Sequence, residues 1–176
     1  MDIVAYRASH REALLSLSLR TWEPVFAQLE SAVPAFVYES FYPAGWRQRQ
    51  AEDLGALLDG EPDNIHVALV DGEPRGWVCT RLHAEDAMGE VYVLATDPDF
   101  HGQGIGRALL QQAESTARAA GMRMIMAETG DDPGHAPARR AYEGTGFQRW
   151  PVARYFKDLA GTTARDEPHS LPIPPL

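Results

Sequence analysis

The chain has 176 residues, 44% of them hydrophobic, which suits one domain with one core and is too short for two full domains. Acidic residues outnumber basic ones by 25 to 16, which gives a formal charge of −9. This balance argues against a nucleic-acid partner, because a phosphate backbone is bound by clustered lysine and arginine. It fits a cationic small-molecule partner, since an acidic surface attracts one.

Composition also bears on location. No apolar run approaches the roughly 20 residues that span a bilayer, and the first residues, Met1 to Val4, lack the basic and apolar regions of a signal peptide. Cys79 is the single cysteine, so no intrachain disulfide is expected. We expect a cytoplasmic protein without a membrane partner. Residues 1–160 are expected to form its domain, and 161–176 an extended, Pro-rich tail.

The N-terminal third is predicted to be mainly helical. Ser9 is the predicted N-cap of the first helix, with Glu12 completing a capping box. Pro24 and Pro34 are predicted to divide the apolar stretch that follows into short helical pieces. In chain order we expect a strand over 3–7, a helix over 9–20, helical pieces within 22–42 and a helix over 45–58.

The middle of the chain is predicted to contain three consecutive strands. β-branched and apolar residues dominate each of them. Asp71-Gly72 separates the first two and is typical of a hairpin turn. The strands are expected over 65–70, 75–83 and 90–96.

Helices and strands alternate in the rest of the chain. Apolar residues spaced along 104–120 predict an amphipathic helix, with Gly121 after its end. A short apolar run over 122–129 predicts a buried strand. Asp132 is a predicted N-cap for a helix that reaches Thr145. A last strand region is predicted over 147–157.

A glycine-rich turn joins the third strand of the middle group to the long helix. Gly102, Gly104 and Gly106 stand in five residues, at a cost of roughly 1 kcal/mol each relative to alanine within a helix. The free N–H groups of a first helical turn and the helix dipole favour an anion there. Glycines also let the backbone approach a pyrophosphate closely. The turn is therefore predicted to bind a phosphorylated ligand.

Two other phosphate loops do not match this turn. A P-loop requires a lysine after its last glycine, and none follows Gly106. A dinucleotide-binding fold requires Gly-x-Gly-x-x-Gly and alternating strands and helices from the start. Here the glycines are spaced differently and three strands precede them. Both alternatives are excluded.

The segment Asp97 to Gly106 resembles the acetyl-CoA signature of the GNAT superfamily, Arg/Gln-x-x-Gly-x-Gly/Ala. A second segment, His135 to Phe147, resembles that family's Asn-x-x-Ala-x-x-x-Tyr-x-x-x-Gly-Phe pattern. The resemblance covers roughly residues 3–157. His101 stands where Arg or Gln is usual and His135 where Asn is usual. The resemblance implies an α/β fold with a mixed, mostly antiparallel sheet flanked by helices, and acetyl-CoA as acetyl donor.

The resemblance also implies a set of residues that bind acetyl-CoA. They come from the strand before the glycine turn, the turn itself and the second motif. This strand is expected to separate from its neighbour at a bulge, which leaves one backbone N–H unpaired. That N–H, for which Leu94 is our candidate, would hold the acetyl carbonyl. The implied residues are Leu94, Ala95, Thr96, His101, Gly102, Gln103, Gly104, Ile105, Gly106, Arg107, His135 and Tyr142.

Two side chains are implied in the chemistry. Tyr142 matches the tyrosine taken as general acid for the departing thiolate; its alternative role is packing helix on sheet. Glu90 begins the strand of Leu94, where some family members have a glutamate as general base; its alternative is an exposed strand end. Asp131, Asp132 and His135 are interpreted as helix caps, so no metal site is expected.

The resemblance implies direct N-acetyl transfer in a ternary complex, without a covalent intermediate. The expected acceptor is a primary amine of a small molecule, and a protein N-terminus or lysine is the second choice. A catalytically silent acyl-CoA sensor is the alternative outside enzymes, motivated by His101 and His135. Because family members often dimerise, sometimes through their C-terminal strands, a homodimer is also expected.

Overall fold

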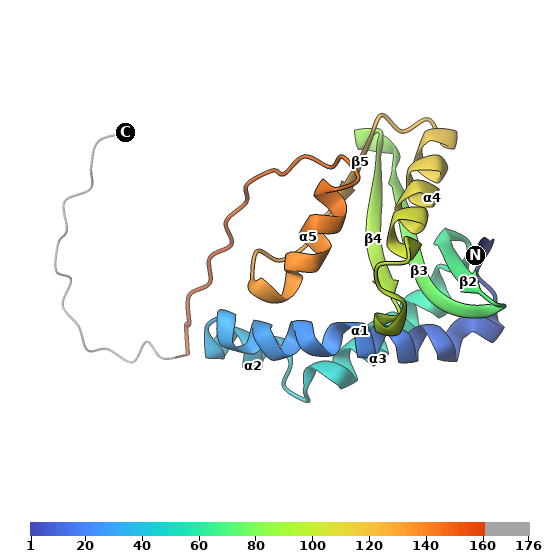
Figure 1. Ribbon diagram of the computed structural model, residues 1–176. Helices are drawn as coiled ribbons and strands as arrows, with labels where there is room; N and C mark the ends of the chain where they lie inside the picture. The colour runs from blue at the N-terminus through green and yellow to red at the C-terminus, as the bar shows by residue number, and fades with distance from the viewer. Residues whose placement is uncertain (161–176) are drawn as a thin grey trace, which may run out of the picture.

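The computed structural model describes residues 1–160. Its centre is a five-stranded sheet in the order β1-β2-β3-β4-β5, with helices on both faces (Figure 1). The first four strands pair antiparallel, and β5 joins β4 in parallel. This confirms the expected mixed, mostly antiparallel sheet. The strands are β1 Asp2–Ala5, β2 Ile65–Val70, β3 Glu73–His83, β4 Met88–Thr96 and β5 Met124–Ala127.

Five α-helices and five short 3-10 turns surround the sheet within the described residues. No helix in this part of the chain combines the length and apolarity needed to span a bilayer. The α-helices are α1 Arg11–Ala32, α2 Ala35–Phe41, α3 Trp46–Gly60, α4 Ile105–Ala119 and α5 Ala136–Glu143. The turns are η1 Ala8–His10, η2 Pro62–Asn64, η3 Ala84–Asp86, η4 Pro98–Phe100 and η5 Pro133–His135.

The sheet has a hydrophobic core on each face. On one face, leucines of α1 and α3 pack on Trp77 and neighbouring strand residues. On the other face, Leu109 and Leu110 of α4 pack on strand residues such as Val78 and Val91. Tyr142 and Phe147 extend this second core. Because alternate residues of a strand face opposite ways, these contacts fix which face each residue of β3 and β4 presents.

The hairpin turn between β2 and β3 follows the prediction. Asp71 and Gly72 both have positive φ, at 53° and 81°. Two successive positive values characterise the type I′ turn, whose twist matches that of the paired strands. The local sequence therefore determines this connection.

The beginning of α1 differs from the prediction. Ser9 lies inside the turn η1 rather than at an N-cap, and α1 begins at Arg11 without a side-chain cap. The local side-chain contact is instead made by His10, whose Nδ1 accepts from the Arg7 amide at 3.2 Å. The capping-box prediction at Ser9 and Glu12 was wrong, because the chain makes one 3-10 turn before the α-helix starts.

Pro24 does not end α1, contrary to the prediction. The helix continues through it to Ala32. Pro24 is exposed, so the carbonyl that loses its partner lies on the solvent side of the helix. Phe26, two residues later, is buried and stacks on Trp46 with ring centroids 4.5 Å apart. Tertiary packing therefore outweighs the lost backbone hydrogen bond. Pro34 does separate α1 from α2, as predicted.

The C-terminal elements are shorter than predicted. β5 covers only Met124–Ala127 and is partly exposed, since it lies at the edge of the sheet. The predicted helix over 132–145 starts as η5, and its α-helical part is Ala136–Glu143. Asp132 caps it as expected, accepting from the Gly134 amide at 3.0 Å.

The predicted strand over 147–157 was wrong. This segment carries no strand and runs from the end of α5 past β5 to α2 (Figure 1). Phe156 packs edge-on against Phe41 of α2, and Arg154 bonds Glu128 at 2.8 Å. Its apolar residues favour a strand locally, but its backbone has no ladder partner among residues 1–160. The expected tail over 161–176 lies outside the described residues.

Candidate functional site

The two parallel strands at the sheet edge separate partway along their length. β4 and β5 pair only from Met88–Val91 against Met124–Ala127. Beyond Val91, β4 continues to Thr96 without a partner on that side among the described residues. The C-terminal half of β4 therefore has an unpaired edge on the side of the segment that follows β5, and we call this edge the opening.

A β-bulge in β4 lies where the strands separate. Cys79 of β3 is opposite Val93, but the next residue, Thr80, is opposite Val91, so Tyr92 is the extra residue. The bulge places Tyr92 and Val93 on the same face as α1 and α3, where Tyr92 lies under the Arg81 guanidinium. Bulges bend and twist the strand that contains them. The bulge is thus a physical cause of the separation from β5.

The backbone of β4 beyond the bulge directs polar groups into the opening. The amide of Asp97 donates to the Arg75 carbonyl of β3 at 2.8 Å. Backbone groups of alternate residues point to opposite sides of a strand. The N–H groups of Leu94 and Thr96 therefore point away from β3, toward the side that β5 has left.

The glycine turn leads directly into α4, as the sequence predicted. Gly102 and Gly104 have φ of 78° and 83°, and a Cβ at either position would meet no atom within 4 Å. Both are exposed, whereas Ile105 is buried in the core with its side chain turned away from solvent. The first intrahelical bond of α4 runs from Ala108 to Gly104, so the amides of the first turn lack helical partners. An open cradle of N–H groups results, which suits a phosphate.

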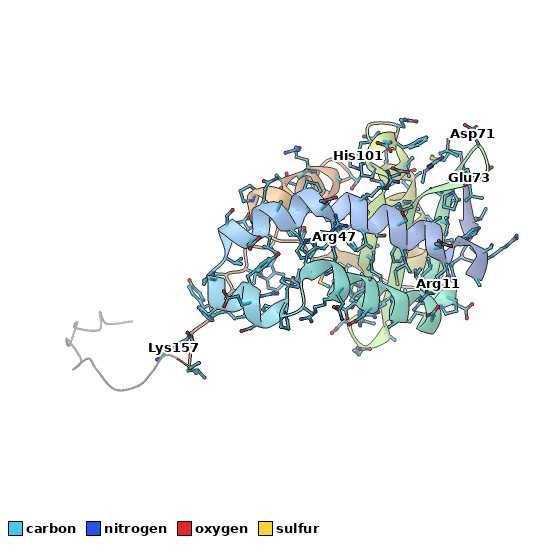
Figure 2. All side chains as sticks on the ribbon, turned by 90° about the horizontal axis from the view of Figure 1, so that it is seen from below. Arg11, Arg47, Asp71, Glu73, His101 and Lys157 are labelled. Atoms are coloured by element: carbon cyan, nitrogen blue, oxygen red, sulfur yellow. The ribbon has the colours of Figure 1, made fainter. Side chains whose placement is uncertain are left out.

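His101 is fixed at the start of this turn. Its Nε2 lies 3.2 Å from the Thr96 carbonyl, which also accepts from the Thr21 hydroxyl of α1 at 2.8 Å. Figure 2 shows His101 beside α1, well apart from Lys157 on the C-terminal segment. The imidazole therefore braces the turn against β4. Gln103 and Arg107 are exposed beside it and Gly106 is partly exposed.

Asp97 anchors the turn, a role that sequence reasoning missed. Its carboxylate is 1% exposed and lies 3.0 Å from Arg20 and 3.2 Å from Arg75. Burial alone would raise the pKa of Asp97, but the Asp99 amide and the two guanidiniums together hold it below its usual value. Arg75 also covers the Phe100 ring. No local feature of the sequence identifies Arg20 and Arg75 as its partners.

Tyr142 lies on the α4 side of the opening. It packs against Phe147, with ring centroids 5.5 Å apart, and against the core that contains Leu94, Ile125 and Ala127. Burial raises the pKa of Tyr142 above its ordinary value. Its phenol therefore stays protonated at neutral pH and is in the form that can donate a proton.

His135 bonds within its own turn. Its Nδ1 lies 2.5 Å from the Asp132 carboxylate, and Arg139 donates to the Asp132 carbonyl at 2.8 Å. The turn packs on α1, since Gly134 lies against the backbone of Val25. Asp132 is therefore a cap, as expected. The prediction was wrong for the other two residues: the His135 side chain caps no backbone N–H and braces Asp132 instead, and Asp131 pairs with Arg149 at 2.6 Å.

Glu90 lies before the bulge, on the face of α1 and α3. Its Oε2 is 2.8 Å from His83 Nε2, and its side chain is 18% exposed. Arg81, directly opposite on β3, forms a two-point contact with Glu61. Glu90 and Tyr142 therefore approach the opening from opposite faces of the sheet.

Comparison with known proteins agrees with this arrangement. The family model described as "Acetyltransferase (GNAT) family" matches residues 29–147. A mycothiol acetyltransferase of Acidothermus cellulolyticus is 35% identical over 114 residues, 64% of this chain and 34% of that protein. One from Actinosynnema mirum is 39% identical over 106 residues, 59% of this chain and 33% of that protein. The chain thus spans about a third of the length of these curated relatives.

Solved structures share the fold. The PaiA N-acetyltransferase of Thermoplasma acidophilum, in complex with coenzyme A, superimposes with a TM-score of 0.61 at 15% identity, covering 86% of this chain and 92% of that one. The aminoglycoside N-acetyltransferase AAC(6')-Iy, in complex with CoA, gives 0.58 at 14% identity, covering 90% and 94%. Together with the family match, the separated strands and the glycine turn, these results establish that the chain belongs to the GNAT acetyltransferase family.

Proposed function

We propose that this protein is an N-acetyltransferase that moves the acetyl group of acetyl-CoA to a primary amine of a small molecule. The observation that carries the proposal is the opening between β4 and β5, with the cradle of free amides at the start of α4 beside it. The positions at Gly102 and Gly104 are open where a Cβ would stand, so a pyrophosphate fits against the backbone. Acetyl-CoA supplies an activated thioester carbonyl.

Each predicted residue has a task in this proposal. The amides of the turn from His101 to Arg107 hold the pyrophosphate, with Gly102 and Gly104 allowing close approach. The pantetheine arm lies along Leu94, Ala95 and Thr96, and the Leu94 N–H holds the acetyl carbonyl as it gains charge. His135 acts indirectly, through its turn.

The proton transfers fall to Glu90 and Tyr142. An amine attacks only as the neutral form, so its ammonium must lose a proton, which Glu90 accepts directly or through water. Tyr142 donates its phenolic proton to the departing sulfur; its raised pKa keeps that proton available at neutral pH. Transfer is direct, because the single cysteine is unsuited to carry the acetyl group. Cys79 is fully buried, and burial raises the pKa of its thiol to about 12, so the thiolate that would act as nucleophile is scarce.

The acceptor class rests on charge and on relatives. The formal charge of −9 favours a cationic amine. The curated relatives are named for mycothiol, a small molecule, and a structural neighbour is named for aminoglycosides. A cytoplasmic location, where acetyl-CoA is available, belongs to the same proposal.

The first experiment is a thermal melt with and without acetyl-CoA, followed by an assay of CoA thiol release. A ligand at 100 times its Kd stabilises a fold by about 2.7 kcal/mol, which raises Tm by several degrees. Thiol release with spermidine or kanamycin supports the proposed acceptor class. Release only with a peptide shifts the acceptor to proteins. Stabilisation without release from any amine supports a silent sensor, and no stabilisation contradicts the acetyl-CoA site.

We further propose that a second copy of the chain covers the edge of β5. Among residues 1–160, no strand pairs with the outer edge of β5. Beside it runs a segment whose apolar side chains are largely exposed, among them Trp150 at 85%, Val152 at 78% and Tyr155 at 89%. Open strand edges and contiguous apolar surface both favour association. Light scattering on the eluted protein should give twice the monomer mass, and Trp150→Ser should shift it toward monomer. A monomer at all concentrations contradicts this proposal.

A further inference from the structure

The pair formed by His83 and Glu90 is a feature that the proposed function does not yet use. His83 ends β3, and its cross-strand partner on β4 is Met88. Glu90 lies two residues after Met88, so the side chains of His83 and Glu90 share the face of α1 and α3. Nε2 of His83 and Oε2 of Glu90 are 2.8 Å apart. The second carboxylate oxygen of Glu90 makes no hydrogen bond to residues 1–160. One oxygen is thus held, and the other is free for a proton donor.

The pair spans the boundary between interior and solvent. The Glu90 side chain is 18% exposed, and that of His83 is 33% exposed. Nδ1 of His83, on the outer side of the ring, lies 4.0 Å from Glu85 of η3, whose side chain is 74% exposed. A proton that reaches His83 therefore has a short path to solvent, past the exposed Glu85 carboxylate.

The other polar groups around Glu90 are already occupied or buried, which makes the His83–Glu90 pair the acceptor of a proton from the amine. Arg81, the cross-strand neighbour of Glu90, is occupied by Glu61 and by the face of Tyr92. Those contacts raise the pKa of Arg81, so it stays charged. Cys79 on the same strand is buried and protonated. The groups that face Glu90 on this side of the sheet include a permanent cation, a protonated thiol, a phenol and one imidazole. Among residues 1–160, the imidazole is the group that hydrogen-bonds the Glu90 carboxylate.

We propose that His83 is a positioning and proton-relay residue for Glu90. This inference rests on the proposed function. The ammonium of the acceptor breaks one N–H bond and its proton binds the Glu90 carboxylate. The proton then passes to Nε2 of His83 in its Nδ1–H tautomer, which restores the carboxylate, and the imidazolium releases its Nδ1 proton to water. The sum is one proton moved from the amine to solvent. His83 is left as the Nε2–H tautomer, which donates to Glu90, and proton exchange with water restores the Nδ1–H tautomer before the next cycle.

The test compares His83→Gln, which keeps a hydrogen-bond donor for Glu90 but cannot relay a proton, with wild type and with Asp86→Asn. Asp86 lies exposed in the same turn η3 and serves as a matched control for charge and folding. We expect His83→Gln to lower kcat about 10-fold above neutral pH, a fraction of the 10²–10⁴ that general acid–base catalysis supplies. The acetyl-CoA melting shift should be unchanged.

Two further variants separate relay from structure. In His83→Ala, added imidazole should restore part of the lost rate, and in Glu90→Gln, adding His83→Ala should cause no further loss. Wild-type kcat in His83→Gln at every pH overturns the inference, as does a uniform loss that imidazole does not relieve. If wild type itself releases no CoA thiol with any amine, the proposed function fails and this inference with it, a result that the variants cannot mimic.

Discussion

The carboxylate of Asp97 lies 3.0 Å from the guanidinium of Arg20, so a residue of α1 holds the loop that precedes the glycine turn. Arg75 of β3 contributes a second contact at 3.2 Å, and the Asp97 side chain is 1% exposed. The turn is therefore fixed to both a helix and a strand before any ligand binds. A ligand site built this way loses little entropy on binding.

Asp97→Asn should destabilise the protein by about 2 kcal/mol at pH 7, because hydrogen bonds to charged groups contribute about 1.5–3 kcal/mol and two guanidiniums lose their counter-ion. Urea unfolding measures this directly. Asp99→Asn is the matched control: Asp99 also bonds Arg20, but its side chain is 75% exposed, so its loss should change stability by less than about 1 kcal/mol. Equal losses in the two variants would contradict the role of burial.

The Asp97 contribution should depend on pH in a defined direction. Its pKa is lower in the folded state than the ordinary value of 3.8. Stabilisation is therefore fully present above the unfolded pKa and is lost as pH falls through the folded pKa. The difference in unfolding free energy between wild type and Asp97→Asn should be constant from neutral pH to about pH 5 and shrink below about pH 4. A difference that grows toward acid would refute the assignment.

Gly104 and Gly121 provide a matched pair at the two ends of α4. Both have positive φ, 83° and 78°, and a Cβ would meet open space at either. An alanine at either position should cost roughly 1 kcal/mol, the penalty of left-handed backbone. Only Gly104→Ala should also reduce the acetyl-CoA melting shift, with Kd raised about 10-fold or more, because its methyl group stands in the pyrophosphate cradle. An equal acetyl-CoA melting shift in both variants would show that the glycine turn is not part of the acetyl-CoA site.

Tyr142→Phe tests the general acid. Removing the hydroxyl should lower kcat about 100-fold, within the range for acid–base catalysis, and leave acetyl-CoA binding intact because the ring still packs on Phe147. Tyr155→Phe, on a side chain that is 89% exposed, should match wild type. Since burial raises the pKa of Tyr142, wild-type kcat should not fall on the alkaline side until above pH 10. Full activity of Tyr142→Phe would assign this residue to packing alone.

The sequence predicted what short-range chemistry determines. Asp71-Gly72 and the three glycines each require positive φ or close approach, so their turns follow from local residue type. The long helix α4 follows from its apolar periodicity. The bulge at Tyr92 was expected only through the family resemblance, since no residue of β4 marks a bulge by itself.

The remaining features depend on partners far away in the chain. Pro24 stays within α1 because Phe26 and its neighbours pack on other elements. The anchoring of Asp97 requires Arg20 and Arg75, and the pairing of Glu90 with His83 requires the register of β3 on β4. The segment over 147–157 has strand-like residues, but a strand forms only where another strand offers its edge. No local pattern carries this information.

Cys79 gives a last test, which bears on mechanism. Its side chain is fully buried and its pKa is raised to about 12, first by burial and then by the nearby Glu61 carboxylate. The thiolate is the reactive form, and at pH 8 it makes up about one part in ten thousand of such a thiol. Ellman's reagent should therefore find no thiol in the folded protein and one in urea, matching the single cysteine. Cys79→Ala should keep kcat within about a factor of two, because direct transfer needs no acetylated cysteine. Rapid labelling of the folded protein, together with loss of turnover in Cys79→Ala, would instead support a covalent acetyl intermediate.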